Sequence, residues 1–199
     1  TSACQAIVRS GLGAGDVAVF VGTGGVGVFG VQLAAARGAH VVGLDVDDRR
    51  LEALGGTLAH SVNVKGREAR EVRDSIRAFI KAKGLRDSVL RVFETSGTTA
   101  GQALAFQLLD RGGSLSIVGF TPEKASLRLS NVMALDADVF GNWGCDPALY
   151  KEVVDLFLDG RVQVRAFVEK RPIDEVNQVL DAARAHALAR RIVLVPNGG

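Results

Sequence analysis

One short stretch near the start of the chain limits its fold more than any other. Residues 17–21 read Val-Ala-Val-Phe-Val, an uninterrupted apolar run that predicts a buried strand. Directly after it come Gly22, Gly24 and Gly27 in the spacing GxGxxG, followed by a helical pattern. A strand, this glycine spacing and a helix in that order predict a turn that binds the diphosphate of a dinucleotide. The alternative is an ordinary glycine-rich turn.

Each of the three glycines has its own expected task in such a turn. We expect Gly22 to allow the tight turn and Gly24 to let the diphosphate approach the backbone. Gly27 would let the helix lie close to the strand. The N–H groups at the start of the helix would then face the phosphates.

An acidic residue lies where the ribose of such a cofactor would be bound. Asp45 follows Gly27 by eighteen residues and ends a strand predicted for residues 40–44. A carboxylate there reaches both hydroxyls of the adenosine ribose and repels a 2′-phosphate, which favours NAD over NADP. Two alternatives stay open. Arg49 and Arg50 would hold a 2′-phosphate if Asp45 were ignored, which would make this an NADP site. Asp45 could otherwise be an acid in a turn that faces solvent.

Strands and helices alternate along the first three quarters of the chain. This alternation predicts right-handed crossovers and an α/β, doubly wound Rossmann fold with a six-stranded parallel sheet. The aliphatic composition, 47% hydrophobic but only 6% aromatic, suits parallel strands buried on both faces. The predicted strands are 17–21, 40–44, 58–62, 89–94, 114–120 and 139–141, and the predicted helices are 2–12, 25–37, 47–54, 66–83 and 98–109.

The pattern changes after the sixth strand. A helix at 147–159, a strand at 164–169, a helix at 173–184 and a strand at 191–195 do not extend the alternation cleanly. We therefore expect two parts, an NAD-binding Rossmann domain at 1–146 and a C-terminal return arm at 147–199 that packs on a further domain. The chain begins at Thr1 inside an apolar segment, so we expect it to be a fragment.

The later strands should complete the cofactor crevice with their carboxyl ends. These ends carry small or polar residues, as a site lined by backbone groups requires, although ordinary turns would look the same. They read Glu94-Thr95-Ser96-Gly97, Val118-Gly119-Phe120 and Gly141-Asn142-Trp143-Gly144.

Composition argues against several other kinds of function. The net charge is +2, from 24 basic and 22 acidic residues, which does not suggest nucleic acid as a partner. No uncharged apolar run reaches the ~18 residues of a membrane span. Cys4 and Cys145 form no CxxC pair, which favours the reducing cytoplasm. The histidines have no metal spacing, so we expect no metal site; they are His40, His60 and His186.

The same motifs resemble those of the zinc-dependent medium-chain alcohol dehydrogenase family. VGTGGVG, LDVDDRR, FETSG, SIVGF and ARRIVLVP occur in that family's order and spacing. The chain is similar to the family's coenzyme domain with its C-terminal segment. The resemblance implies an oxidoreductase that transfers hydride between a secondary alcohol and NAD. It also implies that the catalytic zinc site lies on a separate domain outside this chain. This chain would then have no catalytic residue of its own and would bind the cofactor without turning over substrate.

One part of the resemblance is narrower. The stretch RLSNVMALDADVFGNWGC, with VGFTPEK before it, is similar to family members that oxidise an alicyclic hydroxyacyl-CoA during anaerobic degradation of aromatic compounds. It implies 6-hydroxycyclohex-1-ene-1-carbonyl-CoA as the substrate of the whole protein.

The resemblance also implies a contact with the cofactor for each of a set of residues. Those near the diphosphate are Gly24, Gly25, Val26 and, reaching in from the return arm, Arg190, with Arg191 as the neighbouring candidate. Those near the adenosine are Asp45, Arg50, Thr95 and Ser96. Those near the nicotinamide are Thr1, Val118, Phe120, Asn142 and Trp143.

A homodimer is expected as well. Leu127-Arg128-Leu129 is a short apolar segment beside the presumed sheet edge, and exposed edges pair with other chains. In relatives the matching segment joins two subunits.

Two further interpretations of the function stay open. One is the cofactor domain of an NADPH-dependent, zinc-independent quinone or enoyl reductase, which Asp45 counts against. The other is a stand-alone NAD-sensing module, which the residues beyond the sixth strand count against.

Overall fold

The computed structural model describes residues 1–85, 89–185 and 187–196. Its contacts divide the chain into two compact units, Thr1–Val162 and Gln163–Gly199, and each is described by itself. The sequence predicts a boundary after residue 146, on the ground that residues 147–199 pack on a further domain. That boundary stays a prediction.

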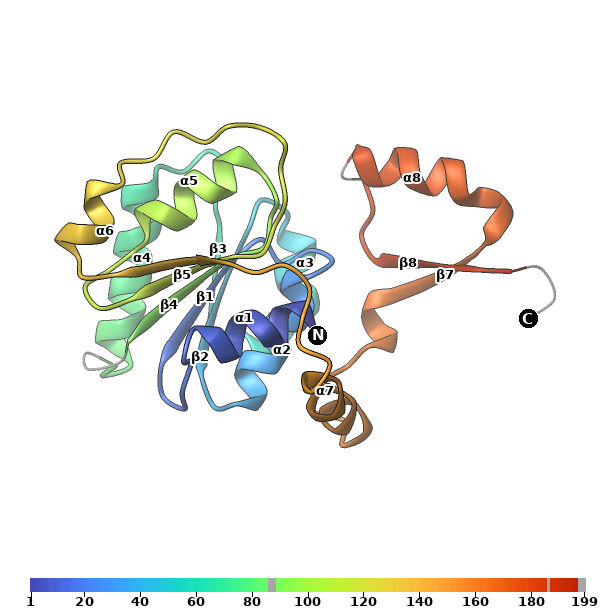
Figure 1. The fold of residues 1–199 in the computed structure, drawn as a ribbon, viewed down its shortest axis with the longest axis horizontal. Helices are drawn as coiled ribbons and strands as arrows, with labels where there is room; N and C mark the ends of the chain where they lie inside the picture. Colours follow the sequence, from blue (N-terminus) through green and yellow to red (C-terminus); the bar gives the residue numbers. More distant parts are fainter. Residues whose placement is uncertain (86–88, 186, 197–199) are drawn as a thin grey trace. The chain divides into compact units, whose positions relative to one another are not determined.

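The first unit is built on a parallel sheet of six strands in the order β3-β2-β1-β4-β5-β6 (Figure 1). Every neighbouring pair is parallel. The chain order reverses between β1 and β4, which makes this the doubly wound Rossmann arrangement expected from the alternation. The strands are β1 Val17–Val21, β2 His40–Asp45, β3 His60–Asn63, β4 Leu90–Glu94, β5 Ser114–Ile117 and β6 Asp138–Gly141.

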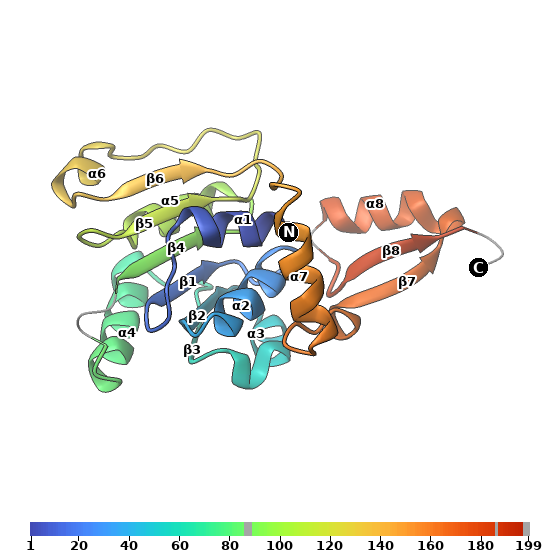
Figure 2. The ribbon, with the colours of Figure 1, turned by 60° about the horizontal axis from the view of Figure 1, so that its bottom comes forward.

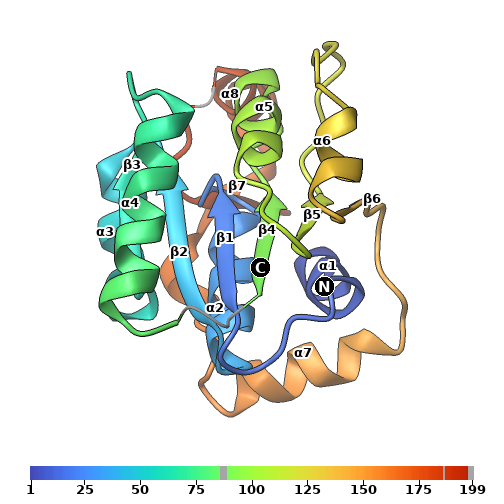
Figure 3. The same ribbon diagram turned by 90° about the vertical axis from the view of Figure 1, so that its left-hand side faces the viewer.

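Helices cover both faces of this sheet (Figures 1 and 3). Buried residues of α4 and α5 form one core with Val17, Val19 and Val21 of β1. On the other face Phe20 contacts α2 at Gly30, and α1 packs on α2. The helices are α1 Ser2–Arg9, α2 Gly27–Ala36, α3 Asp48–Leu54, α4 Ala69–Ala82, α5 Thr99–Gln107, α6 Ser130–Ala134 and α7 Leu149–Leu158, with a 3₁₀ turn, η1, at Gly55–Thr57.

An aromatic pair lies at the centre of the second face. The rings of Phe20 on β1 and Phe93 on β4 are stacked with centroids 4.6 Å apart. Both residues are fully buried. Gly30 leaves room for the Phe20 ring, because a Cβ at Gly30 would overlap the ring edge. The small residue thus lets α2 lie close to the strand that leads into the glycine turn.

Helix α7 belongs to the first unit by its contacts. Its Leu156 is buried, and Glu152 forms an ion pair with Arg37, the residue that ends α2. Just beyond the helix, Arg161 donates to the backbone carbonyl of Ala36. These contacts tie the segment to the end of α2 where the chain turns into β2.

The second unit is a small strand–helix–strand unit (Figure 2). Strands β7 Val168–Pro172 and β8 Arg191–Val195 are parallel neighbours. A 3₁₀ turn at Ile173–Glu175, η3, and helix α8 Val176–Arg184 lie between them. The strand predicted at 164–169 begins later than expected, because Arg165–Phe167 forms another 3₁₀ turn, η2.

Other predicted boundaries also move by a few residues. The helix predicted over 2–12 ends at Arg9, since Gly11 adopts a φ of +67°. The helix expected from Gly25 begins at Gly27, and the strand expected at 58–62 begins at His60 after η1. Among the described helices, none combines the length and apolarity that crossing a bilayer requires.

Truncating the central aromatic pair should be costly. We expect Phe93→Ala to lower the free energy of unfolding by about 3–5 kcal/mol, because it removes a fully buried ring and leaves a cavity. Leu158→Ala, at an exposed position on α7, should change it by less than ~0.5 kcal/mol. Urea unfolding followed by circular dichroism measures both, and similar losses would contradict the central role of the pair.

Candidate cofactor site

The glycine turn connects β1 to α2 at the carboxyl edge of the sheet. Gly22 has a φ of +95°, and a Cβ there would lie 2.6 Å from the Cα of Ser96. A Cβ at Gly27 would overlap the carbonyl oxygen of Gly22. The geometry therefore agrees with the tasks expected of these two glycines: one permits the turn and the close approach of the β4 end, and the other permits the close approach of the helix.

Gly24 differs from the other two because the space beside it is open. A Cβ at Gly24 would meet only the guanidinium of Arg50, with Nη1 at 3.6 Å. Nothing in the fold of the described residues therefore requires glycine at this position for want of space. The opening is what a diphosphate approaching the backbone would use.

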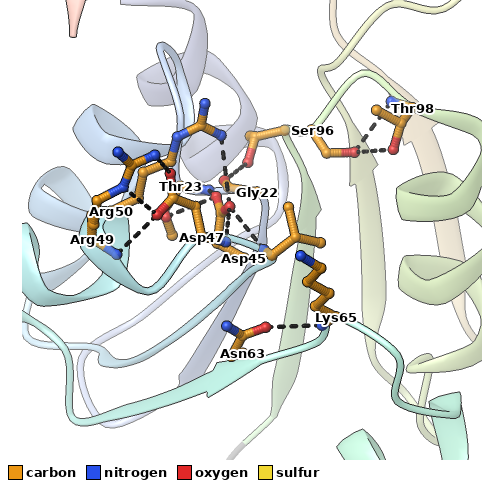
Figure 4. A network of polar contacts seen from close by, with 12 residues as sticks. Gly22, Thr23, Asp45, Asp47, Arg49, Arg50, Asn63, Lys65, Ser96 and Thr98 are labelled. Atoms are coloured by element: carbon orange, nitrogen blue, oxygen red, sulfur yellow. Dashed lines mark hydrogen bonds and ion pairs between the residues drawn. The ribbon is translucent and has the colours of Figure 1, made fainter. Parts of the chain in front are cut away.

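Asp45 points at this turn from the end of β2 (Figure 4). Its Oδ2 accepts hydrogen bonds from the backbone N of Thr23 at 2.8 Å and from the Thr23 hydroxyl at 3.0 Å. Its Oδ1 accepts from the backbone N of Val46 at 2.8 Å and of Asp47 at 3.1 Å. The carboxylate is buried, so it is not a solvent-facing turn acid.

The two arginines beside this acid are each matched with a carboxylate. Arg50 places Nη1 3.6 Å from Oδ1 of Asp45. Arg49 binds Asp47 with two groups, Nε to Oδ1 at 3.0 Å and Nη2 to Oδ2 at 2.7 Å. Asp47 is also the N-cap of α3, accepting from the backbone N of Arg49 at 3.0 Å. The hydrogen bonds from the Arg49 side chain are the main reason that the pKa of Asp47 falls to about 2.

The end of β4 is joined to the turn on one side and to β5 on the other. Thr95 donates through its hydroxyl to the carbonyl of Gly22 at 2.6 Å. Glu94 is fully buried, and its Oε1 accepts from Ser96 N, Ser96 Oγ and Gly97 N at 2.8, 2.6 and 3.0 Å. The backbone carbonyl of Glu94 accepts from the N–H groups of Val118 and Gly119.

The ends of β4 and β5 are also in close contact through glycines. A Cβ at Gly119 would lie 2.6 Å from Oε2 of Glu94, and a Cβ at Gly97 would lie 2.9 Å from the carbonyl oxygen of Phe120. Any larger residue at either position would push these two strand ends apart. The strand predicted over 114–120 in fact ends at Ile117, and the residues that follow form this contact.

The end of β6 lies beside α1. The N–H of Asn142 donates to the carbonyl of Ile117, and its Oδ1 lies 3.4 Å from Nη1 of Arg9. Arg9 also donates to the carbonyl of Gly141. The side chain of Trp143, 91% exposed, projects from the surface next to them.

The structure brings most of the predicted cofactor residues to one edge of the sheet. The turn residues follow β1, Asp45 ends β2, and the ends of β4, β5 and β6 carry the others. Thr1, whose carbonyl accepts from Gln5 N at 3.0 Å, precedes α1. Arg190 is an exposed residue of the second unit and Arg191 begins β8, so their contact with a diphosphate stays a prediction.

The roles of three residues of the site were missed from the sequence. Thr23 holds Asp45 with two hydrogen bonds, Glu94 organises the end of β4, and Arg9 contacts the end of β6. A hydroxyl residue between the first two glycines was the only signal for Thr23. Glu94 was noted as part of a strand end, but nothing in its neighbours along the chain indicates burial of its charge.

No group of residues in the described ranges suits a zinc ion. Those residues contain no cluster of three or more His, Cys, Asp or Glu that could hold a metal. Cys4 and Cys145 are free. His60 stacks on Phe79 and lies 3.0 Å from the Ser75 hydroxyl, and burial lowers its pKa. His186 lies outside the described residues.

Comparison with known proteins places this arrangement in one family. Residues 25–159, more than half of the chain, match the family model described as zinc-binding dehydrogenase. An alcohol dehydrogenase from Geobacillus stearothermophilus is 27% identical over 195 residues, which are 96% of this chain and 53% of that protein.

Solved structures agree with this match. The alcohol dehydrogenase from Aeropyrum pernix superimposes with a TM-score of 0.81 at 27% identity, over 98% of this chain and 55% of that one. A dehydrogenase from Escherichia coli solved with NADH, 14% identical, shares the fold with a TM-score of 0.76, over 98% of this chain and 56% of that one. The chain thus spans about half the length of the proteins that it matches. It belongs to the zinc-binding dehydrogenase family.

Proposed function

We propose that this chain binds NAD(H) as the coenzyme domain of an alcohol dehydrogenase. One observation carries the proposal: a buried carboxylate, Asp45, is directed at an open glycine turn by hydrogen bonds with Thr23. A dinucleotide needs these two features side by side, since the diphosphate and the adenosine ribose are neighbours within it. Family membership supports the proposal, as does the NADH in the Escherichia coli structure with the same fold.

The residues of the chain bind and orient the cofactor in this proposal. The N–H groups at the start of α2, from Gly25 and Val26, donate to the diphosphate, and the helix dipole favours its charge. The ribose hydroxyls donate to Asp45, with Arg50 beside them. Asn142 and Trp143 follow the end of β6 and contact the carboxamide.

The whole protein, on this proposal, transfers hydride between a secondary alcohol and NAD. When bound, NAD supplies the hydride acceptor at its nicotinamide ring. The residues of this chain hold the ring in place, and none of them acts as an acid, a base or a metal ligand. Zinc would be held by a domain outside the residues described. The segment 147–199 would pack against that domain, for which α7 offers exposed Tyr150, Val154 and Leu158.

For the substrate we propose an alicyclic hydroxyacyl-CoA, namely 6-hydroxycyclohex-1-ene-1-carbonyl-CoA. The support is the sequence from Arg128 to Cys145 and the preceding VGFTPEK, both similar to 6-hydroxycyclohex-1-ene-1-carbonyl-CoA dehydrogenase. NAD-linked oxidation of this thioester by the whole protein, measured against a simple secondary alcohol, tests it. A preference for the simple alcohol would overturn it.

We propose the reducing cytoplasm as the compartment of the protein, which the free thiols of Cys4 and Cys145 suit.

The ribose contact predicts a difference between the two cofactors. Asp45→Asn should weaken NADH binding about tenfold or more, the effect of losing one charge-assisted hydrogen bond. NADPH binding should suffer less, because the variant also removes a repulsive charge. Isothermal titration calorimetry on the 199-residue chain measures both. Asp48→Asn, an exposed acid in the first turn of α3, is the control and should leave NADH binding within about twofold. Equal losses for both cofactors would count against the ribose contact.

The opening beside Gly24 predicts a second result. Gly24→Ala should fold normally, since a Cβ there has room, yet NADH binding should fall at least ~tenfold because the methyl group blocks the diphosphate. Gly56→Ala, another glycine with open space around it, is the matched control and should bind NADH as the parent does. Circular dichroism establishes folding and calorimetry the affinity. Unchanged binding in Gly24→Ala would place the diphosphate elsewhere.

The homodimer remains part of the proposal, and the structure selects the residue that tests it. Leu127 packs against the core, so a charge there would unfold the chain. Leu129 is 72% exposed and is therefore the better probe. We expect Leu129→Lys to sediment as a monomer, because a lysine cannot be buried between subunits without a partner. Leu158→Lys, at an equally exposed leucine of α7, should remain a dimer. A dimeric Leu129→Lys variant would place the interface elsewhere.

A further inference from the structure

We infer that Asp47 is a second residue that sets the preference for NAD over NADP, and that it acts by keeping Arg49 away from a 2′-phosphate. The inference rests on the proposed NAD(H) site. It goes beyond that site, because Asp45 excludes the phosphate by its own charge, whereas Asp47 would act only through Arg49. Asp47 is therefore a positioning residue, not a contact residue.

Asp45, which ends β2, and the residues that follow it up to Arg50 carry three acids and two arginines within six residues. Figure 4 shows the two arginines next to each other beside Asp45 and Asp47. Arg50 pairs with Asp45 at 3.6 Å, and Arg49 pairs with Asp47 at 2.7 Å. The charges of these two pairs cancel and Asp48 adds one further negative charge, so the segment offers no excess positive charge to a ligand phosphate.

The Asp47–Arg49 pair has the geometry of a strong interaction. Both carboxylate oxygens of Asp47 accept from the guanidinium of Arg49, one from Nε and one from Nη2. This two-point contact occupies the Nε–Nη2 edge of the guanidinium, one of the edges that can bind a phosphate through two hydrogen bonds. A 2′-phosphate that bound Arg49 through this edge would have to break both hydrogen bonds, and the negative charge of Asp47 would repel a phosphate bound at the remaining donors.

Arg49 is otherwise well suited to a phosphate. Its side chain is 83% exposed, while that of Asp47 is 23% exposed, so the pair lies at the surface where a ligand has access. The backbone N of Asp47 donates to Oδ1 of Asp45, which places the loop directly beside the ribose acid. The hydrogen bonds from Arg49 lower the pKa of Asp47, and those to Asp47 raise the pKa of Arg49. Both shifts have the direction that a formed ion pair requires.

Asp47 has a second role that the experiment must separate from the first. Its carboxylate caps α3 by accepting from the backbone N of Arg49. Asp47→Asn keeps an oxygen for this cap, since asparagine is as good an N-cap as aspartate, but it removes the negative charge that holds the guanidinium. The substitution therefore releases Arg49 without unfolding the start of the helix.

Calorimetric titration of the 199-residue chain with NADH and with NADPH tests the inference. In Asp47→Asn we expect NADPH to bind about threefold to fivefold more tightly, the size of one exposed ion pair, and NADH to stay within about twofold. Adding Arg49→Ala in the double variant should abolish the gain for NADPH. The gain should also shrink in ~1 M salt, where screening acts within ~3 Å.

The outcomes separate this inference from the proposed function. If the parent chain binds neither cofactor, the proposed function fails. If the parent binds NADH but Asp47→Asn changes both affinities by the same factor, Asp47 serves only as a helix cap and the inference is wrong. A gain for NADPH that persists in the double variant also overturns it, because the effect would then not pass through Arg49.

The ion pair itself has an independent readout. The carboxyl carbon of Asp47, followed by NMR against pH, should titrate near the pKa of about 2 in the parent chain. In Arg49→Ala it should rise toward the ordinary value of 3.8. The pKa of Asp47 is lowered because a carboxylate held by a guanidinium gives up its proton more readily. The ion pair is therefore intact above pH ~4 and is lost only as the pH falls through the lowered pKa. A pKa of Asp47 that is the same in both proteins would show that Arg49 does not hold it.

Discussion

The arrangement of the candidate cofactor site depends on one buried carboxylate and the hydrogen bonds it accepts. Asp45 receives two from Thr23, which lies in the glycine turn, and two from the backbone that follows β2. These hydrogen bonds offset the cost of burying an ionised carboxylate. The parallel pairing of β1 with β2 places the two segments side by side, and the carboxylate then holds the turn in one orientation.

A second acid has a comparable position on the other side of the turn. Glu94 ends β4 as Asp45 ends β2, and β1 lies between these two strands in the sheet. Its Oε1 holds the Ser96–Gly97 segment, and its backbone carbonyl holds the residues that follow β5. The turn is thus flanked on both sides by acids that accept hydrogen bonds from the backbone near it.

Much of this could be predicted where the signal is local. The apolar run of β1, the glycine spacing and the position of Asp45 rest on the geometry of one strand, one turn and one helix, so a single stretch of sequence indicates them. The parallel sheet followed from the alternation, because right-handed crossovers leave few other topologies. The boundaries were less accurate, since the ends of β3 and β7 depend on 3₁₀ turns that the hydrophobic pattern does not indicate.

The rest depends on contacts between distant residues. Glu94 and Gly119 are far apart in sequence, yet a Cβ on the glycine would meet the acid. The same holds for Leu127, which looked like part of an exposed edge and instead packs on the core. One consequence concerns how the strand ends around the candidate site are held relative to one another. Gly22 abuts Ser96, Ser96 is bound by Glu94, and Glu94 abuts Gly119, so each group leaves its neighbour no room to move independently. A dinucleotide would therefore meet strand ends that are already fixed relative to one another, so its binding would require little ordering of the protein.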